Sequence, residues 1–203
     1  MKTEVVGVAT AAERQAAVAG AVELLRAGET VALPTETVYG LAADALNVDA
    51  ALKIFEAKER PRFDPLIVHL PDRDWVERLT NAAGDVLVTA LVDRFWPGPL
   101  TLVLRRKPIV PDVVTAGLET VAVRMSAHPI FADIVRELAR PLAAPSANRF
   151  GRISPTEAKH VLAELDGRIP LIVDAGPTKH GLESTIVAPR DDGLEILRHG
   201  PIT

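Results

Sequence analysis

Residues 30–41 read TVALPTETVYGL and join a buried apolar stretch to a cluster of hydroxyl and carboxyl side chains. The apolar part, 30–33, predicts a short buried strand that runs into Pro34. The polar part, 34–40, is typical of the turn that ends such a strand. Polar groups at strand ends meet at one edge of an open α/β sheet, where these sheets bind their ligands. The stretch therefore indicates both a layered fold and the edge that carries a site.

A long helix is predicted ahead of this stretch, over residues 11–27. Thr10 and Glu13 have the spacing of a capping box, which satisfies free amides at a helix start. Gly28 stands where a glycine commonly ends a helix. The apolar residues between these signals recur on one face, as a helix packed against a core requires.

Helices and strands alternate along the rest of the chain. A second capping box, from Ser154 to Glu157, predicts a helix that opens there and runs to about Leu165. Further helices are predicted over residues 49–58, 74–79, 83–94 and 129–139. Further strands are predicted over residues 65–70, 100–105, 120–124, 142–144, 171–174, 184–188 and 194–198. This pattern predicts the α/β fold class, with a mixed sheet covered by helices.

The composition excludes several classes of protein. The 203 residues include 27 acidic and 23 basic side chains, a net charge of −4, which excludes a generally basic nucleic-acid binder. Cysteine is absent, so disulfides, thiolate catalysis and cysteine–zinc sites are excluded. The amino terminus lacks the apolar core of a signal peptide, and no run of about 18 apolar residues predicts a membrane span.

Common nucleotide-binding and catalytic motifs are absent. There is no Gly-Lys pair of a P-loop, no Gly-x-Gly of a dinucleotide site, no His-Glu-x-x-His and no Gly-x-Ser-x-Gly. No metal ligand, nucleophile or acid–base pair is assigned. A phosphate site would therefore be built from side chains and loop amides.

Positive and hydroxyl side chains near strand ends form the candidate site. Residues 58–65, KERPRFDP, hold three cations and two stiffening prolines, which suits a phosphate clamp, although a solvated loop is the alternative. Arg124 ends a buried strand and needs a paired anion, from the protein or from a ligand. With Arg198 and the hydroxyls of Ser146 and Ser184, these residues predict a small anionic ligand that carries phosphate.

Seven motifs, in order along most of the chain, resemble the YrdC-like family of threonylcarbamoyl-AMP synthases. They are PTETVYGL at 34–41, AKERPRFDPLIVHL at 57–70, FWPGPLTLVL at 95–104, TAGLETVAVRMSAHP at 115–129, APSANRFG at 144–151, GLESTIV at 181–187 and LRHGPIT at 197–203. The resemblance implies a twisted mixed parallel and antiparallel sheet flanked by helices, with a basic concave cleft. We expect one YrdC-like catalytic domain over residues 1–203, a short form without the linker and second domain of longer members.

The resemblance also implies a reaction. Family members condense L-threonine, bicarbonate and ATP to threonylcarbamoyl-AMP and pyrophosphate, with Mg²⁺ accompanying the ATP. A separate tRNA-modifying transferase complex then moves the threonylcarbamoyl group to the adenosine beside the anticodon. Weak RNA binding, no membrane partner and a cytoplasmic location are expected.

Site residues carry over motif by motif. The expected threonine-binding set is Thr37, His69, Arg124, Ala144 and Ser184. The expected ATP-binding set is Lys58, Arg60, Asp64, Thr120, Ser146, Asn148, Ser154 and Arg198. Arg124 suits a carboxylate because its guanidinium donates two parallel hydrogen bonds. Arg60 and Arg198 suit the triphosphate, whose charge rises on the leaving pyrophosphate.

Three positions depart from the family pattern. Asp64 stands where many relatives have Asn, and its carboxylate would repel phosphate unless it pairs with Arg60 or Arg62. Ser126 replaces a common Pro after Arg124, and His199 replaces a common Pro before the glycine that follows it. These departures bear on local loop geometry.

Two other functions are compatible with parts of the sequence. A non-catalytic RNA-binding module would use a basic patch at 105–107 together with Arg149 and Arg152, and its affinity would fall steeply with salt. The net negative charge and the 4% of aromatic residues argue against strong binding of that kind. A carbamoyl-adenylate module, as in hydrogenase-maturation carbamoyltransferases, would use carbamoyl phosphate instead of threonine.

Overall fold

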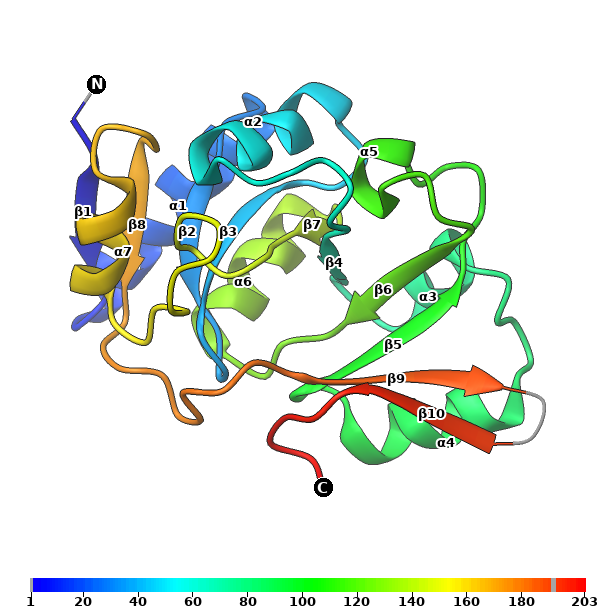
Figure 1. Cartoon of the computed structure of the whole chain (residues 1–203). Helices are drawn as coiled ribbons and strands as arrows, with labels where there is room; N and C mark the ends of the chain where they lie inside the picture. Colours follow the sequence, from blue (N-terminus) through cyan, green and yellow to red (C-terminus); the bar gives the residue numbers. More distant parts are fainter. Residues whose placement is uncertain (1, 191–192) are drawn as a thin grey trace.

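The computed structural model describes residues 2–190 and 193–203, and its strands form one ten-stranded sheet (Figure 1). The strands follow the order β1-β8-β2-β3-β7-β4-β6-β5-β9-β10. Their bounds are β1 Glu4–Gly7, β2 Val31–Pro34, β3 Tyr39–Asp44, β4 Ile67–His69, β5 Leu100–Arg105, β6 Thr120–Arg124, β7 Leu142–Ala143, β8 Leu171–Asp174, β9 Thr185–Arg190 and β10 Gly193–Arg198.

Seven helices flank this sheet within the described residues. Their bounds are α1 Ala11–Arg26, α2 Val48–Lys58, α3 Asp74–Leu79, α4 Val86–Phe95, α5 Asp112–Thr115, α6 Pro129–Leu138 and α7 Ala158–Leu165. Each of these helices is too short or too polar to cross a membrane.

The sheet is mixed, which confirms the predicted fold class. Strand β8 pairs in parallel with β1 and β2, and the pairs β4–β6 and β5–β9 are also parallel. Antiparallel pairs join β2 to β3, β7 to β3 and β4, β5 to β6, and β9 to β10. In Figure 1, β9 and β10 run across the lower part of the molecule, beside the carboxyl terminus.

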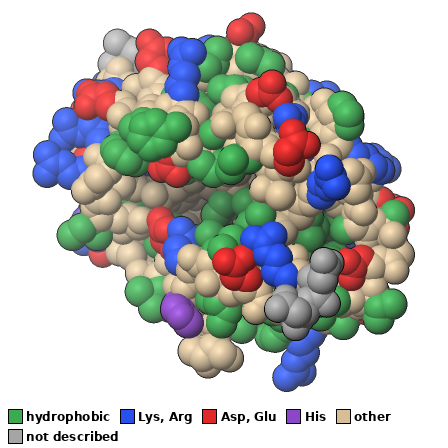
Figure 2. Space-filling model, turned by 45° about the vertical axis from the view of Figure 1, so that its right-hand side comes forward, with side chains coloured by type: hydrophobic (Ala, Val, Ile, Leu, Met, Phe, Trp, Pro, Cys, Tyr) green, Lys and Arg blue, Asp and Glu red, His purple; other side chains and the backbone are tan. Residues whose placement is uncertain are grey.

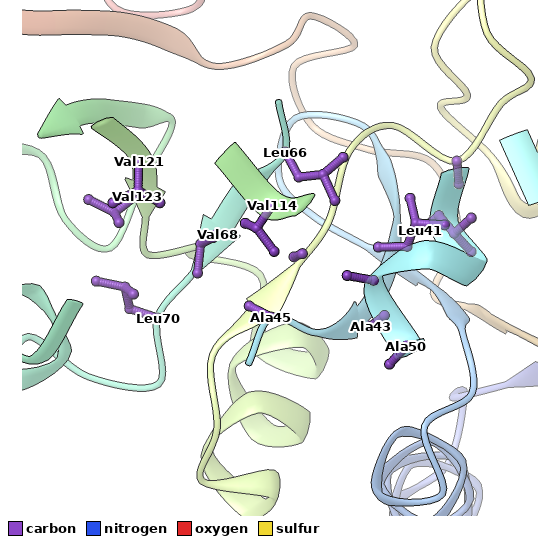
Figure 3. Packing of buried hydrophobic residues seen from close by; sticks show 14 of the residues in the cluster. Leu41, Ala43, Ala45, Ala50, Leu66, Val68, Leu70, Val114, Val121 and Val123 are labelled. Atoms are coloured by element: carbon purple, nitrogen blue, oxygen red, sulfur yellow. The ribbon is translucent and has the colours of Figure 1, made fainter. Parts of the chain in front are cut away.

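Two hydrophobic clusters hold the helices to the sheet. One is built largely from α1, α6, β2 and β8, and its side chains include Val22, Leu33 and Phe131. The other lies around β3, β4 and β6 with α2 and α5, and Figure 3 shows Val68 and Val114 among its members. Strands with apolar side chains on both faces need such cover from both sides. The two clusters fix the strand ends that surround the site.

Several predicted elements are confirmed in detail. Thr10 and Glu13 form both hydrogen bonds of the capping box at the start of α1. Gly28, just after α1, has a φ of 77°, in the left-handed region where glycine carries no Cβ penalty. Strands β5, β6 and β8 have the predicted bounds.

Three short elements were not predicted, namely β1, β3 and α5. Strand β3 (YGLAAD) has no β-branched residue, and Tyr39 is its one strand-favouring side chain, so its sequence carries a weak strand signal. Pairing with β2 and β7 creates this strand. The sequence pattern predicts a turn over residues 34–40, which include only the first two residues of β3.

The prediction of a second capping box, from Ser154 to Glu157, is wrong. Helix α7 begins at Ala158, and its N-cap Glu157 makes no side-chain capping bond. The Ser154 hydroxyl donates instead to the Glu183 carboxylate, 2.8 Å away, in a different part of the chain. A long-range charged acceptor has therefore displaced the local cap.

Candidate functional site

A cavity of about 510 Å³ opens where the ends of several strands meet. Its wall is formed by residues from seven segments, 35–40, 60–69, 103, 118–124, 144–146, 183–190 and 197–198. Figure 2 shows a hollow near the centre of this face, with positive and negative side chains next to one another around it. The predicted polar strand ends therefore do meet at one site.

Ten of the thirteen predicted site residues line this cavity. They are Thr37, Arg60, Asp64, His69, Thr120, Arg124, Ala144, Ser146, Ser184 and Arg198. The other three, Lys58, Asn148 and Ser154, are not among the lining residues.

Lys58 supports the wall from behind. Its side chain is buried, and its Nζ donates to the carbonyl oxygens of Ser146 and Asn148, both 2.5 Å away. Burial, together with the nearby Arg60 charge, lowers the pKa of Lys58 to about 7. Arg62 is exposed, so of the three cations in the predicted clamp only Arg60 lines the cavity. The left-handed C-cap that ends α2 separates Lys58 from the other two.

Arg124 is a buried residue of the cavity wall, at the end of β6. Its Nη2 donates to Glu36 Oε1 at 2.6 Å, its Nη1 to Thr37 Oγ1 at 3.1 Å and its Nε to the carbonyl of Gly98 at 3.3 Å. The guanidinium and the Glu36 carboxylate are only 4% and 8% exposed. These three bonds leave one N–H on each terminal nitrogen, which is what a bidentate carboxylate needs.

Glu36 is the anion that Arg124 requires, and sequence reasoning did not assign it. Its Oε2 accepts from Ser126 Oγ at 2.5 Å and from the backbone N–H of Ala127 at 3.2 Å. Burial tends to raise the pKa of Glu36, but the Arg124 charge and the hydrogen bonds from Ser126 and Arg124 lower it overall. The signal was a lone carboxyl among the hydroxyls of PTETVYGL.

His69 lies beside Arg124, because β4 and β6 pair in parallel with these two residues in register. Its ring is 4.6 Å from that of Phe131, and its Nδ1 has no hydrogen-bond partner among the described residues. Burial, with Arg124 nearby, lowers the pKa of His69 to about 3. The imidazole is therefore neutral near pH 7 and offers one donor and one acceptor.

The more open part of the cavity carries ion pairs that are partly exposed to water. Arg60 pairs with Asp64 at 3.0 Å, as the departure at Asp64 required. Arg198 pairs with Glu183, and its Nη2 also donates to Ser184 Oγ at 3.1 Å. Arg190, which also lines the cavity, pairs with Glu195. Each lining arginine thus has a carboxylate partner, and the basic character of the cleft stays a prediction.

The segment after β10 passes very close to the site. A Cβ on Gly200 would lie 2.4 Å from the backbone nitrogen of Thr185 and 2.5 Å from the carbonyl oxygen of Glu183. The backbone of residues 183–185 is therefore held against Gly200, and it carries two residues of the cavity wall.

Comparison with known proteins identifies the family to which this architecture belongs. A model of the Sua5/YciO/YrdC domain, described as "Telomere recombination", matches residues 23–200. The chain belongs to this family. The threonylcarbamoyl-AMP synthase of Bacillus subtilis is 54% identical over 187 residues, which cover 92% of this chain and 54% of that protein. A putative threonylcarbamoyl-AMP synthase of Mycobacterium tuberculosis is 33% identical and is covered to 92% of its length.

Solved structures of the family share the fold. Pyrococcus abyssi Sua5 complexed with L-threonine has a TM-score of 0.93 and 44% sequence identity, over 98% of this chain and 58% of that one. Escherichia coli YciO has a TM-score of 0.86 at 19% identity, a likeness that shows the fold alone. This chain spans about half the length of the Bacillus and Pyrococcus relatives. The family and the mixed sheet expected from the seven motifs are confirmed.

Proposed function

We propose that the chain is a threonylcarbamoyl-AMP synthase, which condenses L-threonine, bicarbonate and ATP and releases pyrophosphate. The observation that carries the proposal is the single cavity that gathers ten expected substrate-binding residues around the buried Arg124. The names of the family relatives and the Sua5 complex with L-threonine support the same reaction class.

The buried part of the cavity suits an amino acid. The free N–H groups of Arg124 bind its carboxylate, with Thr37 adjacent at 3.1 Å. His69, Ser184 and the backbone of Ala144 complete the threonine-binding set. A site built to hydrogen-bond a substrate hydroxyl rejects analogues that lack it, because its own buried polar groups would then stay unpaired.

The open part of the cavity suits the nucleotide. Arg60 and Arg198 lie in its wall, and phosphate oxygens compete with Asp64 and Glu183 for these guanidiniums. Thr120 and Ser146 supply hydroxyls in the same wall. Lys58 acts through the carbonyls of Ser146 and Asn148, which it holds. Asn148 acts through the following loop, because its Nδ2 donates to the carbonyls of Arg149 and Arg152. Ser154 acts through Glu183.

The chemistry needs position and charge more than a protein nucleophile. The neutral amine of threonine bonds to the carbon of carbon dioxide, which is in equilibrium with bicarbonate, and loses a proton to give a carbamate. A carbamate oxygen then attacks the α-phosphorus of ATP, and the bond to pyrophosphate breaks. Holding the reactants together and stabilising the departing charge supply most of the rate enhancement of such reactions.

Mg²⁺ fits this site as a companion of the triphosphate. The cavity carboxylates Asp64 and Glu183 are ion-paired, and the described residues contain no group of three or more potential metal ligands. Phosphate oxygens and water are therefore the ligands that remain, which is the usual way this ion binds with nucleotides.

The product would serve a transferase complex that modifies tRNA in the cytoplasm.

The deciding experiment follows pyrophosphate. Protein, magnesium-ATP, bicarbonate and L-threonine are mixed, and we expect pyrophosphate release that depends on threonine. Release that is absent, or equally fast without threonine, rejects the synthase. The likeness to HypF, at 17% identity, shows the fold alone and does not decide whether the carbamoyl-adenylate alternative holds. Substituting carbamoyl phosphate for threonine tests that alternative.

The RNA-binding alternative has less support from the structure. Arg106 pairs with Asp112, and Arg149 pairs with Glu164. The Nζ of Lys107 donates to the backbone carbonyl of Glu77. Arg105 and Arg152 are exposed, so the patch keeps some accessible charge, and the net charge of −4 remains the main argument against strong binding to a phosphate backbone.

A further inference from the structure

The hydrogens of two buried hydroxyls, on Thr35 and Thr37, can be assigned from their neighbours. Thr35 Oγ1 lies 2.7 Å from the carbonyl oxygen of Val38 and 2.8 Å from Thr37 Oγ1. Two oxygens this close need one hydrogen between them. The Val38 carbonyl has none to give, so the Thr35 hydroxyl donates to it. The hydrogen in the second contact must then come from Thr37.

The remaining contacts agree with this direction. Arg124 can only donate, so Thr37 Oγ1 accepts from its Nη1 at 3.1 Å. The backbone N–H groups of Thr37 and Val38 reach Thr35 Oγ1 over the longer distances of 3.1 and 3.2 Å, and they share its lone pairs. The chain of bonds therefore runs in one direction, from Arg124 through Thr37 and Thr35 to the Val38 carbonyl.

This direction decides what Thr37 offers to the cavity. Its hydrogen is committed to Thr35 and one lone pair to Arg124, so this cavity-lining hydroxyl has only an acceptor lone pair left to offer. Arg124, beside it, keeps only donors. An α-amino acid matches this pair, because its carboxylate accepts from Arg124 while its amine or its hydroxyl donates to Thr37.

We propose that Thr35 is a positioning residue, which holds the Thr37 hydroxyl as an acceptor for a donor group of the bound amino acid. Thr35 acts through Thr37, and its own hydroxyl needs no contact with substrate. The inference rests on the proposed function, since it takes the amino acid of that reaction as the ligand.

The test is a double-mutant cycle with a conservative control. In Thr35→Val the Thr37 hydrogen is free to turn into the cavity, and we expect the KM for threonine to rise about tenfold, with the KM for ATP within about twofold; a tenfold change corresponds to about 1.4 kcal/mol. Thr35→Ser keeps the hydroxyl and should behave as the unsubstituted protein. If Thr35 acts through Thr37, adding Thr35→Val to Thr37→Val causes no further rise.

Additive effects in the cycle, or an equal rise in both KM values, overturn the proposal and leave Thr35 a merely structural residue. A Thr35→Val variant with an unchanged threonine KM also overturns it. Because Thr35 also accepts two backbone N–H groups, this variant can fail to fold. Nuclear Overhauser contacts from the buried hydroxyl hydrogens of the unsubstituted protein then decide. The Thr37 hydrogen should lie toward Thr35, and a Thr35 hydrogen directed at Thr37 contradicts the inference.

The outcome is separable from that of the proposed function. If the unsubstituted protein releases pyrophosphate with threonine while the cycle is additive, only the role of Thr35 fails. If the unsubstituted protein shows no threonine-dependent release, the synthase itself fails.

Discussion

The two ends of the cavity are built on different principles. At the buried end, Arg124 and Glu36 form an ion pair that is 4% and 8% exposed. At the open end, Arg198 and Glu183 are 33% and 34% exposed, and Arg60 and Asp64 are 13% and 37% exposed. Buried charges are costly to leave unpaired, whereas exposed pairs contribute about 0–1 kcal/mol. The pair at the buried end is therefore fixed by the fold itself, and under the proposed function the carboxylates at the open end can be exchanged for phosphates.

The largest expected effect on stability comes from removing the carboxylate at the buried end, compared with removing the carboxylate at the open end. Glu36→Ala leaves Arg124 buried and unpaired, and we expect it to lower the free energy of unfolding by about 3–5 kcal/mol. Glu183→Ala is the matched control, because its arginine is accessible to water, and its expected cost is about 1 kcal/mol or less. Urea unfolding of both variants measures the difference. Equal costs would remove the contrast between the ends.

The pH dependence of stability probes the buried end through His69. Its pKa is about 3 in the folded protein, below the usual value of 6.5, so the unfolded chain binds the extra proton between these values. Stability is therefore lost as the pH falls, and linkage gives about 2 kcal/mol between pH 7 and pH 5. His69→Gln should remove that part of the loss in urea unfolding at the two pH values. An unchanged slope would show that the pKa of His69 is the same in the folded and the unfolded protein.

A smaller effect is expected from Ser126. Its hydroxyl donates to the buried Glu36 carboxylate, and a hydrogen bond to a charged group contributes about 1.5 kcal/mol or more. We expect Ser126→Ala to lose about 1.5 kcal/mol of unfolding free energy, measured by urea unfolding. No loss would mean that Arg124 and the Ala127 N–H suffice to hold Glu36.

The smallest effect on stability is expected at Arg198. Because its ion pair is partly exposed to water, Arg198→Ala should change the free energy of unfolding by less than about 1 kcal/mol. The same variant should raise the KM for ATP more than the KM for threonine, in the pyrophosphate assay at fixed ionic strength. A larger rise for threonine would indicate that Arg198 acts mainly through Ser184, to which its Nη2 donates.

Much of the fold was predictable because its signals are local. The capping box of α1, the glycine after it and the apolar runs of β5, β6 and β8 depend on neighbouring residues only. Strand β3 was not predictable in this way, because pairing with β2 and β7 creates it. The prediction of where α7 begins failed for a related reason, since the Ser154 hydroxyl has its hydrogen-bond partner 29 residues away.

The candidate site, too, was predictable where its signals are local and not where they depend on distant residues. Residue types at strand ends and the family motifs predict which segments meet. They do not predict that Glu36 and Arg124, 88 residues apart, form a buried pair. Neither do they predict that Lys58 turns inward to two backbone carbonyls while Arg60 faces the cavity. Such choices depend on distances between distant segments.

The tight packing at Gly200 has a consequence for mutational tolerance. The β-carbon of even an alanine would overlap backbone atoms of residues 183–185, which cannot rotate aside as a side chain would. Displacement of that backbone would shift Glu183 and Ser184 together, one from each end of the cavity. In a saturation library, position 200 should therefore accept glycine alone, although Gly200 is not among the residues that line the cavity.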